Sequence, residues 1–170
     1  RCKCAWFDKD RLVALENRES EYVFNEKYLA NDRISQLIIS SVKQQKTEFE
    51  NRFSSLSIPV FFLSHQSRLP IQMAYKTPET LGNDRIAAAV GAEHLFPRSN
   101  LLIIDMGTCM TMDFVSSKGI YYGGAISPGV KMRFKALHHY TARLPLIDNI
   151  PNAVPLTGNS THNSIMTGVV

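Results

Sequence analysis

The sequence predicts an α/β protein of two lobes, each with mixed strands in a sheet flanked by helices. Short apolar runs of buried-strand length lie at residues 36–42 and 59–64, and helical signals precede each of them. Strands that alternate with helices favour sheets with parallel strand pairs and helices packed on them. A similar layout restarts with strands at Leu101, so we expect lobes at residues 1–98 and 99–170 with a cleft between them.

The elements of the first lobe follow from local signals. We expect, in order, strands at 2–7 and 12–15, a helix at 22–30, a strand at 36–42, a helix that carries Phe49, Phe53 and Leu56 on one face, and a strand at 59–64. Thr47 and Glu50 have the spacing of a capping box for the second helix. Residues 68–81 contain two prolines and are expected to form a loop or a short extended stretch.

Asp84 lies where a polar turn leads into a predicted helix. Gly82, Asn83, Asp84 and Arg85 precede an alanine-rich segment, residues 86–94, that favours a helix. A carboxylate near a helix N-terminus stabilises the helix by about 0.3–1 kcal/mol, so Asp84 has a purely structural interpretation. The alternative is that Asp84 is a functional acid.

Residues 101–129 are predicted to form a meander of three strands around a polar turn. The strand runs are bounded by glycine, serine and proline and lie at 101–104, 111–115 and 120–126. Asp105, Gly107 and Thr108 follow the first of them. Glycine lets the backbone approach a ligand closely, and a turn with one acid and several donors suits a phosphate with its cation. An exposed acidic hairpin turn explains the same residues without a ligand.

Two helices are predicted in the remaining part of the chain. The first covers residues 128–144, and three prolines in residues 144–156 then indicate a loop. The second carries Ile165 and Val169 on one face and follows a polar turn whose candidate caps are Asn159, Ser160 and Thr161.

Composition excludes several classes of protein and favours the cytoplasm. The net charge of +4 suits an anionic substrate. The sequence contains no dense run of Lys and Arg, so nucleic acid is not the first expectation. The three cysteines form no disulfide framework, which is typical of a reducing compartment, and Cys2 and Cys4 are only a weak metal signal. No apolar run approaches the roughly 20 residues that span a bilayer, so no membrane partner is expected.

Five motifs follow one another in the last part of the chain. They are Tyr75-x-x-Pro78-x-x-Leu81-Gly82-x-Asp84-Arg85, Ile104-Asp105-x-Gly107-Thr108-x-x-Thr111-x-Asp113, Gly123-Gly124-x-Ile126-x-Pro128-Gly129, Leu144-Pro145 and Gly158-Asn159-x-Thr161. In this order they resemble type III pantothenate kinase, whereas the first 70 residues match that family only in layout. The resemblance implies two ribonuclease H-like lobes, as in the superfamily of acetate and sugar kinases, heat-shock chaperones and actin.

The resemblance also implies an activity and a set of site residues. The activity is ATP-dependent phosphorylation of pantothenate, the first step of coenzyme A synthesis, by a cytoplasmic homodimer that needs Mg2+ and a monovalent cation, K+ or NH4+. Asp84 matches the general base, Asp105 the ligand of the monovalent cation and Thr108 an ATP contact. The matches to pantothenate-binding residues are Tyr75, Gly82, Asn83, Asp84, Arg85 and Thr161, the last of them reaching across the dimer interface.

Two other functions compete with this one. A superfamily member that hydrolyses ATP or phosphorylates a sugar lacks the Gly-x-Asp-Arg turn that this sequence carries at Gly82. A regulatory or nucleic-acid-associated accessory protein without kinase activity is the non-enzymatic alternative, but no helix-turn-helix pattern supports it. Nucleic-acid binding would weaken steeply with salt, which separates the two classes.

We also expect the chain to be truncated at both ends. It begins with Arg1 rather than Met and stops within an apolar helical pattern at Val170. The family's first phosphate loop, an Asp-x-Gly-Asn-Thr turn, would precede Arg1. On this expectation, these 170 residues alone bind ATP poorly.

Overall fold

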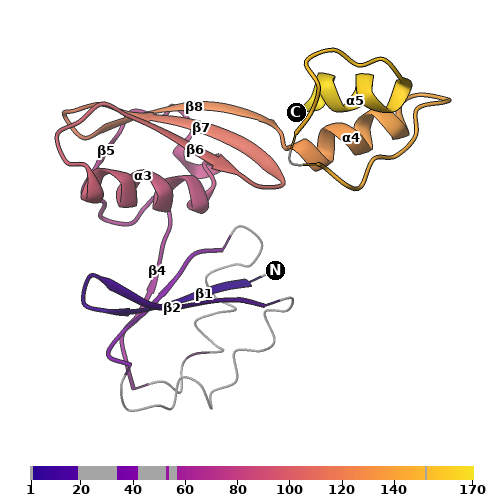
Figure 1. Cartoon of the computed structure of the whole chain (residues 1–170). Helices are drawn as coiled ribbons and strands as arrows, with labels where there is room; N and C mark the ends of the chain where they lie inside the picture. Colours follow the sequence, from indigo (N-terminus) through magenta and orange to yellow (C-terminus); the bar gives the residue numbers. More distant parts are fainter. Residues whose placement is uncertain (1, 19–33, 42–52, 54–56, 152) are drawn as a thin grey trace. The chain divides into compact units, whose positions relative to one another are not determined.

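The computed structural model describes residues 2–18, 34–41, 53, 57–151 and 153–170 and divides the chain into two compact units (Figure 1). Unit 1 is Arg1–Leu63 and unit 2 is Ser64–Val170. The helices predicted at residues 22–30 and around Phe49 to Leu56 lie outside the described residues, apart from Phe53. The lobe boundary expected between residues 98 and 99 stays a prediction.

Unit 1 contains two strand pairs. β1 (Cys2–Asp8) and β2 (Arg11–Arg18) form an antiparallel hairpin, and β3 (Leu37–Ile39) pairs in parallel with β4 (Val60–Phe62). Lys9 takes a positive φ of 53° in the hairpin turn. The four predicted strands of this part of the chain are therefore confirmed, and so is the expectation of a parallel pair.

Unit 2 is built on a four-stranded sheet with the order β5-β8-β7-β6. Its strands are β5 (Gln72–Met73), β6 (Leu101–Met106), β7 (Cys109–Val115) and β8 (Ile120–Pro128). β6, β7 and β8 form the predicted antiparallel meander, and β5 adds a parallel edge beside β8. β5 and the 3-10 helix η2 (Pro78–Thr80) lie in the stretch for which we expected a loop or a short extended segment.

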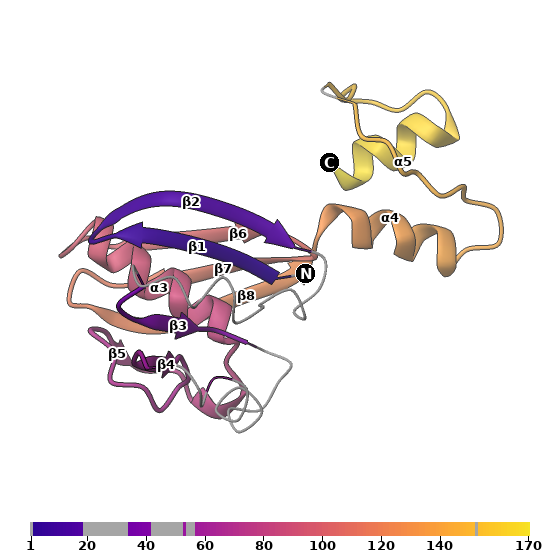
Figure 2. The same ribbon diagram turned by 90° about the horizontal axis from the view of Figure 1, so that it is seen from below.

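One helix covers a face of this sheet. α3 (Asn83–Leu95) packs against β6 and β7, as Figures 1 and 2 show. Ile86 and Ala89 on its inner side are fully buried. The helix begins three residues before the predicted segment, so the polar turn at Asn83 to Arg85 is its first turn. No helix in the described part of the chain is both long and apolar enough to cross a membrane.

The last two helices pack on each other around a small core. α4 (Val130–His139) and α5 (Thr161–Val169) lie side by side in Figure 1. Their shared core consists of Phe134, Ile147, Ile165, Met166 and Val169.

The helix predicted at residues 128–144 is wrong at both ends. Pro128 belongs to β8, where it pairs with Cys109, and α4 ends at His139. The Thr141 hydroxyl donates to the Leu137 carbonyl at 2.6 Å and satisfies a group of the last turn. Pro145 further disfavours helical backbone at Leu144, the last residue of the predicted helix.

Candidate active site

A buried ion pair connects α3 to the sheet of unit 2. Arg85, in the first turn of α3, donates from Nε to both carboxylate oxygens of Asp113 in β7, at 3.0 and 3.2 Å. Its Nη2 donates to Oδ1 of the same carboxylate at 2.5 Å. The side chains are only 7% and 2% exposed. A charge at this depth requires a partner of opposite sign, and each residue supplies the other's.

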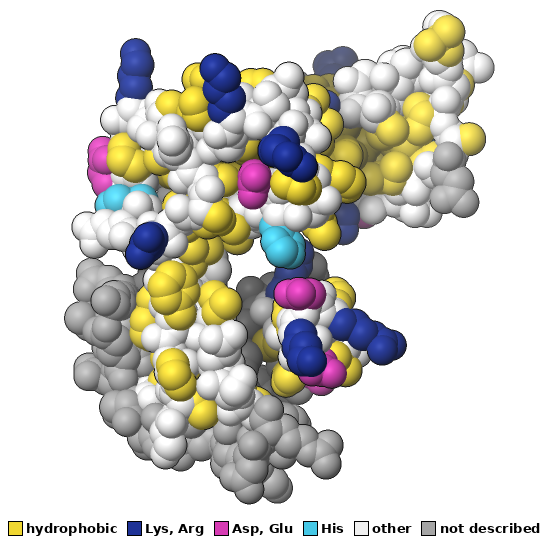
Figure 3. Space-filling model, turned by 90° about the vertical axis from the view of Figure 1, so that its left-hand side faces the viewer, with side chains coloured by type: hydrophobic (Ala, Val, Ile, Leu, Met, Phe, Trp, Pro, Cys, Tyr) yellow, Lys and Arg dark blue, Asp and Glu magenta, His cyan; other side chains and the backbone are white. Residues whose placement is uncertain are grey.

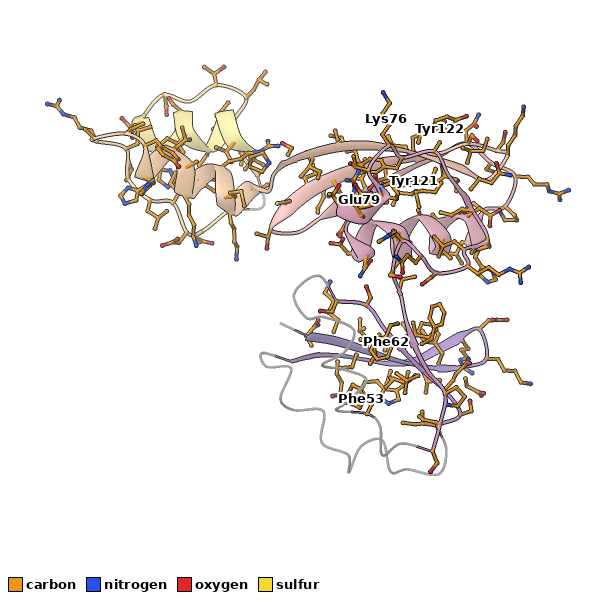
Figure 4. The ribbon with its side chains drawn as sticks, turned by 180° about the vertical axis from the view of Figure 1, so that it is seen from behind. Phe53, Phe62, Lys76, Glu79, Tyr121 and Tyr122 are labelled. Carbon is orange, nitrogen blue, oxygen red and sulfur yellow. The ribbon has the colours of Figure 1, made fainter. Side chains whose placement is uncertain are left out.

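Tyr121 completes the buried cluster. Its hydroxyl donates to Asp113 Oδ1 at 2.6 Å from the neighbouring strand β8. Thr111, Asp113 and Val115 alternate along β7 onto one face, and Val115 pairs with Tyr121 in the sheet. Figure 4 shows Tyr121 beside α3, whereas Tyr122 lies on the other side of the sheet. Alternation along β7, together with the register shift between Gly123 and Tyr121 in β8, therefore delivers both partners to the face that α3 covers.

Arg85 and Tyr121 both have raised pKa values. The hydrogen bond to Asp113 raises the pKa of Arg85 and outweighs burial, which acts in the opposite direction. Burial raises the pKa of Tyr121 above its ordinary value, and its hydrogen bond to Asp113 raises that pKa further. Arg85 stays a cation and Tyr121 stays a neutral donor throughout the neutral pH range.

Tyr75 lies over the guanidinium of Arg85. The guanidinium carbon is 5.8 Å from the centre of the Tyr75 ring, within the range of a cation–π contact. The Tyr75 and Tyr121 rings are 6.1 Å apart and tilted by 50°. Gly123 has a φ of +89°, and a Cβ atom there would lie 2.6 Å from the Tyr75 ring. Glycine at this position therefore provides the space that Tyr75 occupies.

Asp84 faces away from this cluster although it is the neighbour of Arg85. Successive helix residues diverge by about 100°, so an inward Arg85 leaves Asp84 at the exposed N-terminus of α3. The Asp84 carboxylate accepts a hydrogen bond from the Arg85 backbone N–H at 2.9 Å. Its Oδ1 contacts the position that a Cβ atom would take at Gly82. The absence of that atom lets the carboxylate fold back over the turn.

The second polar turn joins β6 to β7 and lies against the start of α4. Asp105 and Thr108 are both exposed. The Gly129 N–H donates to the Thr108 carbonyl at 3.0 Å. A Cβ atom at Gly129 would contact the carbonyl oxygens of Gly107 and Thr108, so glycine permits this close approach.

The structure brings together only part of the predicted site. Tyr75 and Arg85 are in contact, and Gly82, Asn83 and Asp84 are in the same turn. Thr161 is the exposed first residue of α5. Among the described residues, no hydrogen bond or ion pair joins Asp105, Thr108 or Thr161 to the ion pair of Arg85. Their ligand roles stay predictions.

Two members of the buried cluster received no role from the sequence. Asp113 belongs to one of the five motifs without a predicted role, and Tyr121 lies outside all of them. Met112 and Phe114 alternate with Asp113 and so face the other side of the sheet, which means that the strand pattern alone does not signal a buried partner for Asp113. No signal in the sequence identifies Tyr121 either.

The described residues contain no group of three or more His, Cys, Asp or Glu side chains that could hold a metal ion. Cys4 and Cys109 are free thiols. The exposed carboxylate of Asp105 is an oxygen ligand of the kind that hard cations prefer. A cation held by Asp105 would need further ligands from outside the described residues, and this role stays a prediction.

Comparison with protein families gives one match over the whole chain. Residues 1–170 match the family described as type III pantothenate kinase. A protein of that name from Cytophaga hutchinsonii is 52% identical over 136 residues, which are 79% of this chain and 55% of the relative. One from Phocaeicola vulgatus is 40% identical over 170 residues, 99% and 69% of the two chains. The chain thus spans about half to two thirds of the length of these curated relatives.

A solved structure has a similar fold. It comes from Campylobacter jejuni and is described as a conserved Baf family transcriptional activator. The TM-score is 0.57 with 23% sequence identity, over 85% of this chain and 62% of the other. This likeness supports the mixed α/β arrangement of sheets and helices.

Proposed function

Because the chain belongs to the type III pantothenate kinase family, we propose that the whole protein phosphorylates pantothenate with ATP, as the first step of coenzyme A synthesis. The observation that carries this proposal is the pairing of two consecutive residues. Asp84 has an exposed carboxylate, and the buried guanidinium of Arg85 beside it is anchored by Asp113. One turn thereby offers a proton acceptor and a group that attracts an anion.

Asp84 is assigned the role of general base. Phosphoryl transfer needs the attacking hydroxyl to be oriented and its proton accepted, and a carboxylate can do both. The Arg85 N–H donates to this carboxylate, and the space at Gly82 lets it lie over the turn. In this position the carboxylate would accept the proton of the primary hydroxyl of pantothenate when that hydroxyl attacks ATP.

Arg85 and Tyr75 are assigned to the pantothenate carboxylate. Asp113 accepts from Nε and Nη2 of Arg85, so Nη1 is the atom we assign to the substrate. A guanidinium suits a carboxylate both in charge and in hydrogen-bond geometry. Asn83 and Thr161 are further substrate contacts in this proposal, with Thr161 acting across a homodimer interface.

Thr108 and Asp105 are assigned to the nucleotide and its monovalent cation. Both lie in or beside the exposed turn between β6 and β7. Mg2+ neutralises phosphate charge when ATP is bound, and K+ or NH4+ would take an oxygen of Asp105. The proposal includes two ribonuclease H-like lobes, residues 1–98 and 99–170, and a cytoplasmic location.

The regulatory alternative is not favoured by the family match. On the face in Figure 3, the Lys and Arg side chains of the described residues are scattered among apolar and acidic ones. A continuous basic stripe would be more typical of a nucleic-acid-binding surface.

The Asp84→Asn variant of the intact protein tests the proposal. We expect wild type to form phosphopantothenate from pantothenate, ATP, Mg2+ and K+, and the variant to lose about 10²–10⁴-fold in kcat. Its melting temperature should stay close to that of wild type because Asp84 is exposed. Asp148→Asn, at another exposed acid, is the matched control. Full activity of the Asp84 variant would reject this base, and an inactive wild type would reject the function.

A further inference from the structure

We infer that Asp113 is a positioning residue that orients Arg85 toward the substrate carboxylate, and that Tyr121 holds Asp113 in place. This inference rests on the proposed function. Asp113 itself is 2% exposed and is covered by Arg85, so it acts through the guanidinium rather than on the substrate.

The geometry of the ion pair fixes one edge of the guanidinium. Nε and Nη2 both donate to Asp113, so the plane of the group is determined by two parallel contacts. A planar group held along one edge directs its remaining nitrogen, Nη1, along a defined line. A lysine in this position would keep the charge but lose that direction.

The support of Asp113 is as rigid as the sheet itself. Asp113 lies in β7, which pairs with β6 on one side and with β8 on the other. The Tyr121 hydroxyl, on β8, donates to Asp113 Oδ1 at 2.6 Å, so a second strand holds the carboxylate. Two strands thus determine where the Arg85 guanidinium lies.

Stability alone does not require these three polar side chains. A buried ion pair is often replaceable by apolar residues of similar volume without loss of stability, because desolvation offsets the attraction. Apolar residues could not hold a cation in a fixed position and orientation. The arrangement is therefore explained better by the orientation of Arg85 than by the free energy of folding.

The test uses Asp113→Asn and Tyr121→Phe in the intact protein, with kcat and both KM values as readouts. We expect the Asp113 variant to raise KM for pantothenate about tenfold or more while KM for ATP changes less than about twofold. Tyr121→Phe removes one oxygen and should raise KM for pantothenate about two- to fivefold. Tyr122→Phe, whose ring contacts Phe114 at 5.9 Å on the other side of the sheet, is the control.

A second substrate separates positioning from general damage. An analogue in which a neutral amide replaces the pantothenate carboxylate should lose less kcat/KM in both variants than pantothenate does. Equal losses for the acid and the amide, or an unchanged KM for pantothenate, would overturn the inference while wild type remains a pantothenate kinase. If Asp113→Asn does not fold, Tyr121→Phe decides alone. A wild type that does not phosphorylate pantothenate overturns both this inference and the proposed function.

Discussion

Gly82 places the Asp84 carboxylate by lacking a single carbon atom. Its φ of −59° and ψ of 133° are open to any residue, so backbone freedom is not the reason for glycine here. The reason is space, because Asp84 Oδ1 contacts the position of a Cβ atom at residue 82. A side chain at residue 82 would therefore displace the Asp84 carboxylate, two positions further along the chain.

The Gly82→Ala variant should fold normally and turn over slowly. The added methyl group displaces only the flexible end of Asp84, so the melting temperature should change little. A displaced base should lower kcat about tenfold or more, measured with saturating pantothenate and ATP. Gly91→Ala is the matched control, because its Cβ would meet open space within the same helix. An unchanged kcat in the Gly82 variant would show that the carboxylate position is unimportant.

The raised pKa of the Tyr121 hydroxyl predicts that the folded protein loses stability at alkaline pH. In the unfolded chain it ionises near its ordinary pKa of about 10, whereas the folded protein raises that pKa. Above about pH 10 the folded state therefore binds more protons than the unfolded state, and the free energy of unfolding falls with rising pH. Its contribution to the slope approaches about 1.4 kcal/mol per pH unit for one proton.

Urea unfolding of wild type and Tyr121→Phe between pH 8 and 11.5 measures this contribution. Wild type should be the more stable protein below pH 10, and the difference should shrink as the pH rises. Parallel curves over the whole range would contradict the assignment of the proton to Tyr121. Tyr122→Phe controls for the loss of a phenol elsewhere.

Elements differ in how far the sequence predicts them. The meander of β6, β7 and β8 could be predicted because its apolar runs end at turn residues such as Gly119, which has a positive φ of 71°. The bounds of α4 could not, since its start depends on the extension of β8 through Pro128 and its end on the Thr141 hydroxyl. Local patterns identify an element more reliably than they define its boundaries.

The start of α5 depends on one side-chain cap. Ser160 Oγ accepts from the Asn163 backbone N–H at 3.1 Å, so Ser160 is the cap among the three predicted candidates. Ser160→Ala should lower the free energy of unfolding by about 1 kcal/mol, measured by urea denaturation. Thr157→Ala, at an exposed residue before the helix, should have a smaller effect. Equal stability of both variants would argue against the cap.

The pairing of Arg85 with Asp113 belongs to the scale of the whole molecule. The two residues are 28 positions apart, and neither α3 nor β7 contains a local signal that selects the other. The motifs identified the turn at Asp84 because its residues are contiguous. They give no role to Asp113, because its ion pair with Arg85 forms only when the helix packs on the sheet.

Gly129 joins the sheet of unit 2 to its last two helices. A Cβ atom there would contact two backbone carbonyls, at Gly107 and Thr108, and backbone cannot yield cheaply. Gly129→Ala should therefore lower stability by about 1–3 kcal/mol and raise KM for ATP more than KM for pantothenate. Gly168→Ala, with open space around it in α5, is the control. A selective effect on pantothenate would contradict the nucleotide role of this turn.

The divergence of Asp84 and Arg85 on α3 has a consequence for how such a protein changes over generations. Because neighbouring helix positions point about 100° apart, a residue inserted between Asp84 and Arg85 would turn the acid away while the arginine stayed paired with Asp113. A substitution changes one of the two residues, whereas an insertion changes the direction of one side chain relative to the other. A change in length at this turn should therefore impair the protein more than a change in length in an exposed loop outside it.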